Sequence, residues 1–147
     1  MKRLLASLIL LSVIALGIYA FQIGTRPPEP TVTVAQKSVQ TTEGSYCWDG
    51  LLRAGCVDKA YTSVYHMGNK KNAVVVEPNS TIMINFDREP IDGTLEVEKW
   101  LNEDEVEGID MNHETFTAPS EKGLYVYHIM AHWKQGGGSY AFSIKVE

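Results

Sequence analysis

The chain has 147 residues, which is about the length of one domain and excludes a multi-domain enzyme. Its composition, with 44% hydrophobic and 21% charged residues, is ordinary for a globular protein. Without Lys2, Arg3 and Arg26 the chain has ten basic and eighteen acidic residues, and this net charge of −8 argues against nucleic acid and anionic membrane surfaces as binding partners.

The N-terminal segment, residues 1–24, has the features of an export signal. Lys2 and Arg3 precede an apolar run over residues 4–21 that two serines interrupt. Because signal-peptide apolar regions usually span about 7 to 15 residues, the longer run favours an uncleaved transmembrane anchor helix. Residues 15–17 offer a small-x-small cleavage site, so a cleaved signal peptide is the alternative. We therefore expect a single-pass cell-membrane protein with an extracytoplasmic C-terminal domain, or a secreted protein.

The next segment, residues 25–44, contains three prolines followed by a polar stretch with little hydrophobic periodicity. This composition predicts a proline-containing polar linker that holds a folded domain away from the membrane. We place that extracytoplasmic domain at residues 45–147.

The two cysteines, Cys47 and Cys56, both follow the export segment, and oxidising compartments favour their pairing. We expect a disulfide that pins a local loop or hairpin within an N-terminal segment of the domain, residues 45–71. The turn-forming pair Asp49-Gly50 lies between the cysteines. Redox motifs use two intervening residues, and a zinc site needs more ligands nearby, which argues against both.

From residue 45 onward, short apolar runs alternate with clusters of Gly, Pro, Asn and Asp, and this pattern predicts an all-β sandwich or barrel. In chain order, we predict strands at 72–77, 80–87, 94–101, 115–117, 123–133 and 139–146, with the last two joined by a turn at 134–138. If Tyr125 faces inward, the two-residue period of a strand turns Tyr127 and the alternate residues through Trp133 inward as well.

The sequence Glu121-Lys122-Gly123-Leu124-Tyr125-Val126-Tyr127 resembles the acidic-x-Gly-x-Tyr-x-Cys signature of the sixth strand of immunoglobulin-like domains. Tyr127 stands where antibody domains have cysteine, and Tyr125 matches the structural tyrosine-corner position. The resemblance implies an immunoglobulin-like β-sandwich of about seven strands. The chain as a whole combines the export segment with Gly44-Ser45-Tyr46-Cys47-Trp48, Cys56-Val57-Asp58 and an end running from Phe116-Thr117-Ala118-Pro119 to Tyr125-Val126-Tyr127. In these features it resembles small exported proteins of Gram-positive bacteria of unassigned activity, which implies location and not chemistry.

The outer face of the sheet is the candidate binding face. Strand alternation places His128, Met130 and His132 on that face, and Trp100 joins them if its strand is a neighbour. Such an aromatic and partly apolar patch is typical of surfaces that bind a protein or a glycan.

Metal binding is the first alternative function. His128 and His132 are about 13 Å apart on one strand, too far to share a metal unless a bulge intervenes. Each could be one ligand of a site that His113 and nearby carboxylates complete. The candidate metal ligands are therefore His113, His128, His132, Glu96 and Glu98.

An acidic segment spans residues 87–114 and contains eleven acidic residues but only two basic ones. Its most oxygen-rich part, residues 102–112, does not match the ligand spacing of an EF-hand. A solvated acidic loop is the simpler interpretation, and weak calcium binding or attraction to a basic partner are the alternatives.

For catalysis, the sequence contains no Gly-x-Ser-x-Gly elbow, phosphate-binding glycine loop, His-Glu-x-x-His motif or free thiol near a histidine. We therefore expect a non-catalytic binding or structural module at the cell envelope, without a cofactor, whose partner is an envelope protein or glycan. The alternatives are an exported metal-binding protein and a small envelope hydrolase that uses a pair of carboxylates.

Overall fold

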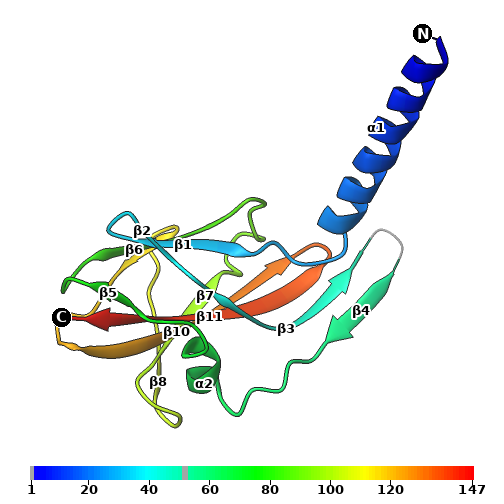
Figure 1. Ribbon diagram of the computed structural model, residues 1–147. Helices are drawn as coiled ribbons and strands as arrows, with labels where there is room; N and C mark the ends of the chain where they lie inside the picture. The colour runs from blue at the N-terminus through cyan, green and yellow to red at the C-terminus, as the bar shows by residue number, and fades with distance from the viewer. Residues whose placement is uncertain (1, 51–52) are drawn as a thin grey trace.

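The computed structural model describes residues 2–50 and 53–147, and its strands form two β-sheets that pack face to face (Figure 1). The smaller sheet is antiparallel, with the order β2-β1-β6-β9. Its strands are β1 (Pro30–Val34), β2 (Lys37–Val39), β6 (Thr81–Phe86) and β9 (Thr115–Thr117). The larger sheet has the order β4-β3-β11-β10-β7-β8. Its strands are β3 (Thr42–Asp49), β4 (Ala54–Val57), β7 (Glu96–Trp100), β8 (Val106–Gly108), β10 (Gly123–Trp133) and β11 (Gly136–Val146), and β5 (Val74–Val76) runs parallel to the end of β11.

The core lies between the two sheets and comes from the inward-facing residues of most strands, whereas β4 and β8 are exposed throughout. Ile82 and Ile84 of β6 are fully buried against the larger sheet. In that sheet, Tyr127 stacks on Phe142 of β11, with ring centroids 5.1 Å apart. The inward-facing residues of the two sheets thus form one main hydrophobic cluster, and Trp48, Ala131 and Trp133 form a second, smaller one.

The prediction for the long C-terminal hairpin is confirmed. β10 has the predicted bounds, and its inward-facing residues from Tyr125 to Trp133 are all buried. The turn, however, is shorter than predicted, because β11 begins at Gly136 and the glycine run belongs to the strand. The predicted strand at 115–117 is also present, as β9.

The prediction of a linker over residues 25–44 is wrong for its larger part. Residues 30–34 and 37–39 form β1 and β2, and β3 begins at Thr42. The reason is the alternation within β1, which buries Val32 and Val34 in the core while its threonines face away. The chain from Pro30 onward is thus part of the sandwich, which has more strands than the seven expected.

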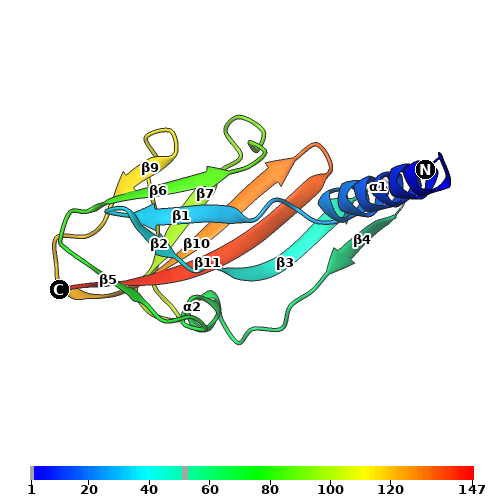
Figure 2. The ribbon, with the colours of Figure 1, turned by 45° about the horizontal axis from the view of Figure 1, so that its top comes forward.

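The N-terminal helix α1 (Lys2–Ile23) leads away from the sandwich (Figure 1). The β3–β4 hairpin extends beyond the smaller sheet beside the point where α1 joins the domain (Figures 1 and 2). There, Trp48 Nε1 donates a hydrogen bond to the Gly24 carbonyl at 3.2 Å. The predicted transmembrane anchor is not supported: within the described part of the chain, no helix has the length and apolar character needed to cross a membrane.

A short helix that the sequence did not predict, α2 (Val64–Gly68), covers part of the outer face of the larger sheet. Ser63 caps it by accepting a hydrogen bond from His66 N at 3.0 Å. Gly68 lies so close to the sheet that a Cβ there would come within 2.3 Å of Val126 Cγ1. As a result Val126 is buried under α2, although it lies on the outer face of the sheet.

Candidate functional site

The four residues of the predicted binding face do lie on the outer face of two neighbouring strands. β7 pairs with β10 so that Trp100 stands opposite Val126 and Glu98 stands opposite His128. Glu98 joins two of the predicted residues: its Oε2 accepts a hydrogen bond from Trp100 Nε1 at 3.1 Å and lies 3.2 Å from His128 Nδ1. Trp100 and His128 thus form a half-buried polar cluster around one carboxylate.

The other two residues of the predicted face, Met130 and His132, line a groove of about 490 Å³. We call it the outer groove. Its floor is formed by Gly137, Gly138 and Ser139 of β11, and its far wall by β3 and β4. The remaining lining residues are Ser45, Tyr46, Cys47, Cys56, Val57 and Asp58.

One glycine explains why a trough forms on this face of the sheet. The Gly137 position is on the same face as His132 and Cys47, its partners on β10 and β3, and its missing side chain leaves space between them. Gly138 alternates to the inner face, where a Cβ would meet Pro27. The His132 ring leans over Gly137, where a Cβ would come within 2.6 Å of His132 Cδ2. Gly136 has φ of +147°, and a Cβ there would lie 2.1 Å from the Cys47 carbonyl oxygen. Glycine is therefore required at Gly136 for β11 to approach β3.

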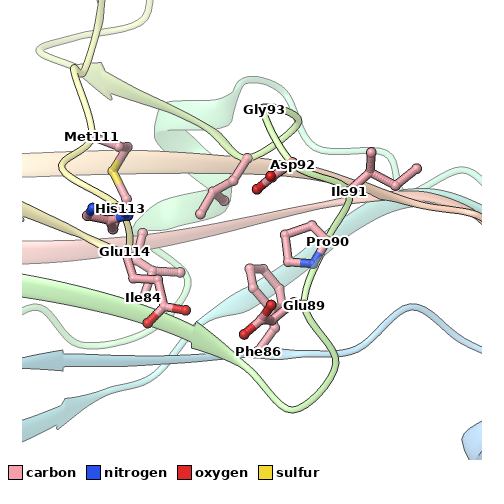
Figure 3. Close-up of a pocket in the computed structure, with 11 residues that line it drawn as sticks. Ile84, Phe86, Glu89, Pro90, Ile91, Asp92, Gly93, Met111, His113 and Glu114 are labelled. Carbon is pink, nitrogen blue, oxygen red and sulfur yellow. The ribbon is translucent and has the colours of Figure 1, made fainter.

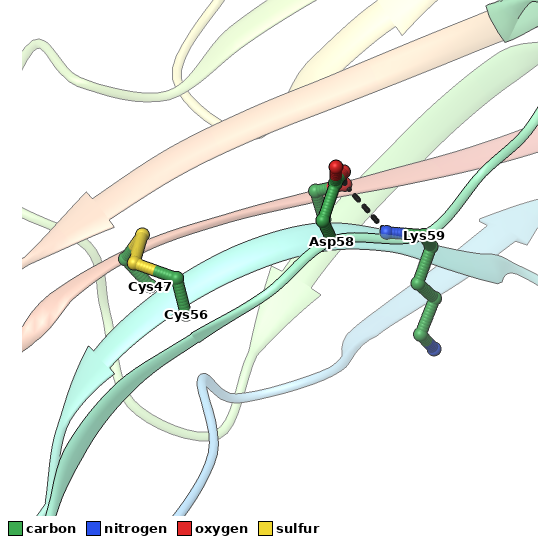
Figure 4. Close-up of a disulfide and its surroundings, with 5 residues drawn as sticks. Cys47, Cys56, Asp58 and Lys59 are labelled. Carbon is green, nitrogen blue, oxygen red and sulfur yellow. Dashed lines mark hydrogen bonds between the residues drawn. A yellow bond between two sulfur atoms is a disulfide. The ribbon is translucent and has the colours of Figure 1, made fainter.

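The disulfide lies in the β3–β4 wall of the outer groove, across Gly137 from His132. Cys47 and Cys56 stand directly opposite each other on β3 and β4 and are joined, as predicted (Figure 4). The chain after β4 is also held, because Lys59 N donates to Ser45 Oγ at 3.0 Å and Ser45 Oγ donates to Asp58 Oδ1 at 2.9 Å. This wall is fixed by covalent and hydrogen bonds rather than by burial.

Strand β4 is an exposed edge. All four of its residues are exposed, and within the described ranges β4 has a neighbouring strand on one side only. Gly50 N donates to the Arg53 carbonyl at 3.1 Å, which fixes the alternation of the antiparallel pair. Counting from that bond, the backbone N–H and C=O groups of Ala54 and Cys56 point away from β3.

The predicted metal ligands are not brought together. His128 and Glu98 are adjacent, but His132 lies further along β10 at the outer groove, and His113 lines a pocket between the two sheets. Among the residues that the structure describes, no group of three or more His, Cys, Asp or Glu side chains is placed to hold a metal ion. In the segment considered for calcium, Asn102 Oδ1 instead accepts hydrogen bonds from Asp104 N and Glu105 N, at 2.9 Å and 3.0 Å.

Sequence reasoning found two residues of the outer groove and missed its floor. The sequence pattern predicts a turn at residues 136–138, whereas continuous pairing of β10 with β11 places these glycines within the sheet. The signal that could have revealed the floor is the length of β10, since an eleven-residue strand in a tight hairpin needs a partner of equal length.

Comparisons of the chain with protein-family models, curated proteins and solved structures found no match.

Proposed function

We propose that this protein is a non-catalytic, extracytoplasmic binding module that takes up an extended segment of a partner protein along β4. Side chains of that segment occupy the outer groove. The observation that carries the proposal is the exposed, uncharged edge strand β4 directly beside a preformed groove.

The edge of β4 is the first support. Natural sheets usually protect their edges with charged residues, proline or bulges, because unpaired backbone groups attract other strands. The sequence of β4, Ala54–Val57, has none of these, although Arg53 and Asp58 flank it. An added strand would satisfy the outward-facing backbone groups of Ala54 and Cys56, and alternate side chains would confer specificity.

The nature of the groove favours a polypeptide over a glycan as the partner. Glycan recognition commonly uses an exposed aromatic ring as a stacking surface. Trp48 and Trp133 are 3% and 5% exposed and form part of the core, and Trp100 is hydrogen-bonded to Glu98. The outer groove is instead walled by a thioether, a disulfide and an imidazole, which suit apolar side chains.

We also propose that the two sheets form an immunoglobulin-like sandwich. The strand order β6-β9 in one sheet and β7-β10-β11 in the other corresponds to the B–E and C–F–G neighbours of that fold. Tyr125 Oη donates to the Glu121 carbonyl at 2.9 Å, as in a tyrosine corner. Tyr127, at the usual cysteine position, packs on Phe116 and Phe142 instead. The extracytoplasmic address is supported by the disulfide.

The test uses random dodecapeptides displayed on phage and selected on the full-length protein. We expect the selected peptides to lose binding to the Met130→Asp variant, which places a charge in the outer groove. They should retain binding to Leu124→Asp, a matched control on the same strand and face that does not line the groove. Equal binding to wild type and Met130→Asp, or selection of no peptide at all, would contradict the proposal.

A further inference from the structure

A second pocket, of about 500 Å³, is lined by β6 and by the segments before β7 and after β8 (Figure 3). We call it the interlayer pocket. Strand β4 lies at the opposite edge of the larger sheet from β8. The pocket exists because β9 pairs with Thr81 to Met83 and ends there, while β6 continues to Phe86. Its floor consists of core side chains, among them the fully buried Ile84 and the half-buried Phe86, Leu95 and Met111.

Both walls of the interlayer pocket are held by backbone hydrogen bonds. One wall is the loop that connects β6 to β7. In this loop, Ile91 N donates to the His132 carbonyl at 2.8 Å, and Thr94 N donates to the Ile91 carbonyl at 3.0 Å. The opposite wall is tied down where Ile109 N donates to the Val97 carbonyl at 2.8 Å and Ile84 N donates to the Glu114 carbonyl at 2.9 Å. A pocket with such walls is preformed, so a ligand does not have to order them.

The rim of the interlayer pocket is acidic. Glu89 and Asp92 lie on one wall and Glu114 on the other (Figure 3). All three side chains are exposed, and none has an ion pair or side-chain hydrogen bond with another described residue. No lysine or arginine lines the pocket. The three carboxylates therefore give the rim negative charge that no ion pair with a described residue offsets, and His113 is the one lining residue that a proton could make positive.

We propose that the interlayer pocket binds a basic and apolar segment of a partner protein, a site independent of the outer groove. The arrangement fixes the orientation of the occupant. An apolar side chain enters and contacts the floor, while flanking lysine or arginine side chains stay at the mouth, beside the carboxylates. The reverse orientation would bury an ammonium group against Ile84 and Leu95, which is unfavourable because a charge loses its hydration there.

The experiment titrates three capped tripeptides into the full-length, isotopically labelled protein and follows backbone amide shifts by NMR. The probes are lysine–phenylalanine–lysine, glutamate–phenylalanine–glutamate and lysine–serine–lysine. We expect the first to shift amides of the interlayer pocket and to bind roughly tenfold more tightly than the others, with an affinity that falls as salt is added.

Two triple variants distinguish the effect of the rim carboxylates on binding from the effect of the protein's net charge. Glu89→Gln, Asp92→Asn and Glu114→Gln together neutralise the rim without changing its shape, and should weaken the basic probe roughly tenfold. The control, Glu103→Gln with Asp104→Asn and Glu105→Gln, removes the same charge from an exposed loop that does not line the pocket, and should leave the affinity within about twofold.

Several results would overturn the proposal. Absence of binding by the basic apolar probe, equal binding of the acidic probe, or equal losses in the two triple variants would each do so. Shifts confined to the outer groove would also overturn it while leaving the proposed function standing. Conversely, Met130→Asp should not affect binding of the tripeptide, so the two proposals fail independently.

Discussion

Two buried tyrosines provide a matched test of the packing described above. Tyr127 and Tyr140 are 0% and 1% exposed, and both rings pack in the same core. Tyr140 Oη donates a 2.7 Å hydrogen bond to the Pro28 carbonyl, whereas Tyr127 Oη has no partner among the protein atoms that the structure describes. Phenylalanine at either position removes the same oxygen from a similar environment.

The expected effects differ in sign or size. Tyr140→Phe removes a hydrogen bond and leaves the Pro28 carbonyl unpaired, which should lower the free energy of unfolding by about 1 to 2 kcal/mol. Tyr127→Phe removes a desolvated hydroxyl that makes no bond, so the free energy of unfolding should be unchanged or rise by up to about 1 kcal/mol.

Urea unfolding of both variants, with a common slope, measures the two changes. Equal destabilisation by the two substitutions would refute the reasoning. If Tyr140→Phe left the free energy of unfolding unchanged, the segment containing Pro28 would not pack on the domain in solution. That result would favour the linker predicted for residues 25–44.

Three further predictions concern the hairpin, the glycine run and alkaline pH. Replacing Cys47 and Cys56 together by serine should cost about 2.5 kcal/mol of unfolding free energy, given their separation of nine residues, and a cost below about 0.5 kcal/mol in urea unfolding would contradict this. Gly136→Ala should lower the free energy of unfolding by more than about 2 kcal/mol, because the added Cβ would collide with the backbone of Cys47. Gly55→Ala is the control, since open space surrounds that position and the thermal midpoint should change little. Similar thermal midpoints for the two variants would contradict this prediction. Burial raises the pKa of both core tyrosines above the ordinary value of about 10, so the unfolded chain loses protons there before the folded one does. Stability should therefore be independent of tyrosine ionisation at neutral pH and fall as pH rises above about 10, and urea midpoints that stay constant across that range would disagree.

Most strands after residue 72 could be predicted from the sequence because their apolar residues alternate. Strand β8 could not be, since its three residues are all exposed and show no alternation. Where the alternation is short, the prediction was wrong: β1 buries Pro30, Val32 and Val34, but the prolines and polar residues around the two valines suggested a linker. Helix α2 was missed for a related reason, since five residues are too few to show a helical period. Its position on the outer face depends on a contact between Gly68 and Val126 that no local pattern encodes.

The sequence predicted which residues of β10 share a face, but not which residues of the neighbouring strands lie opposite them. Alternation alone placed Met130, His132 and His128 on one face, and the structure agrees. Their division into a groove and a carboxylate cluster depends on strand register, which sets Gly137 opposite His132 and Glu98 opposite His128. Register is fixed by the whole hairpin rather than by any of these residues.

The most direct measurement of the central claim is the hydrogen exchange of the β4 backbone amides in the presence of a peptide selected on the full-length protein. The account predicts that the amides of Ala54 and Cys56, which point away from β3, become protected when the peptide pairs with the edge. The amide of Gly55, already directed towards β3, serves as the internal reference. Saturation with peptide and no change in exchange at Ala54 and Cys56 would contradict strand addition at β4.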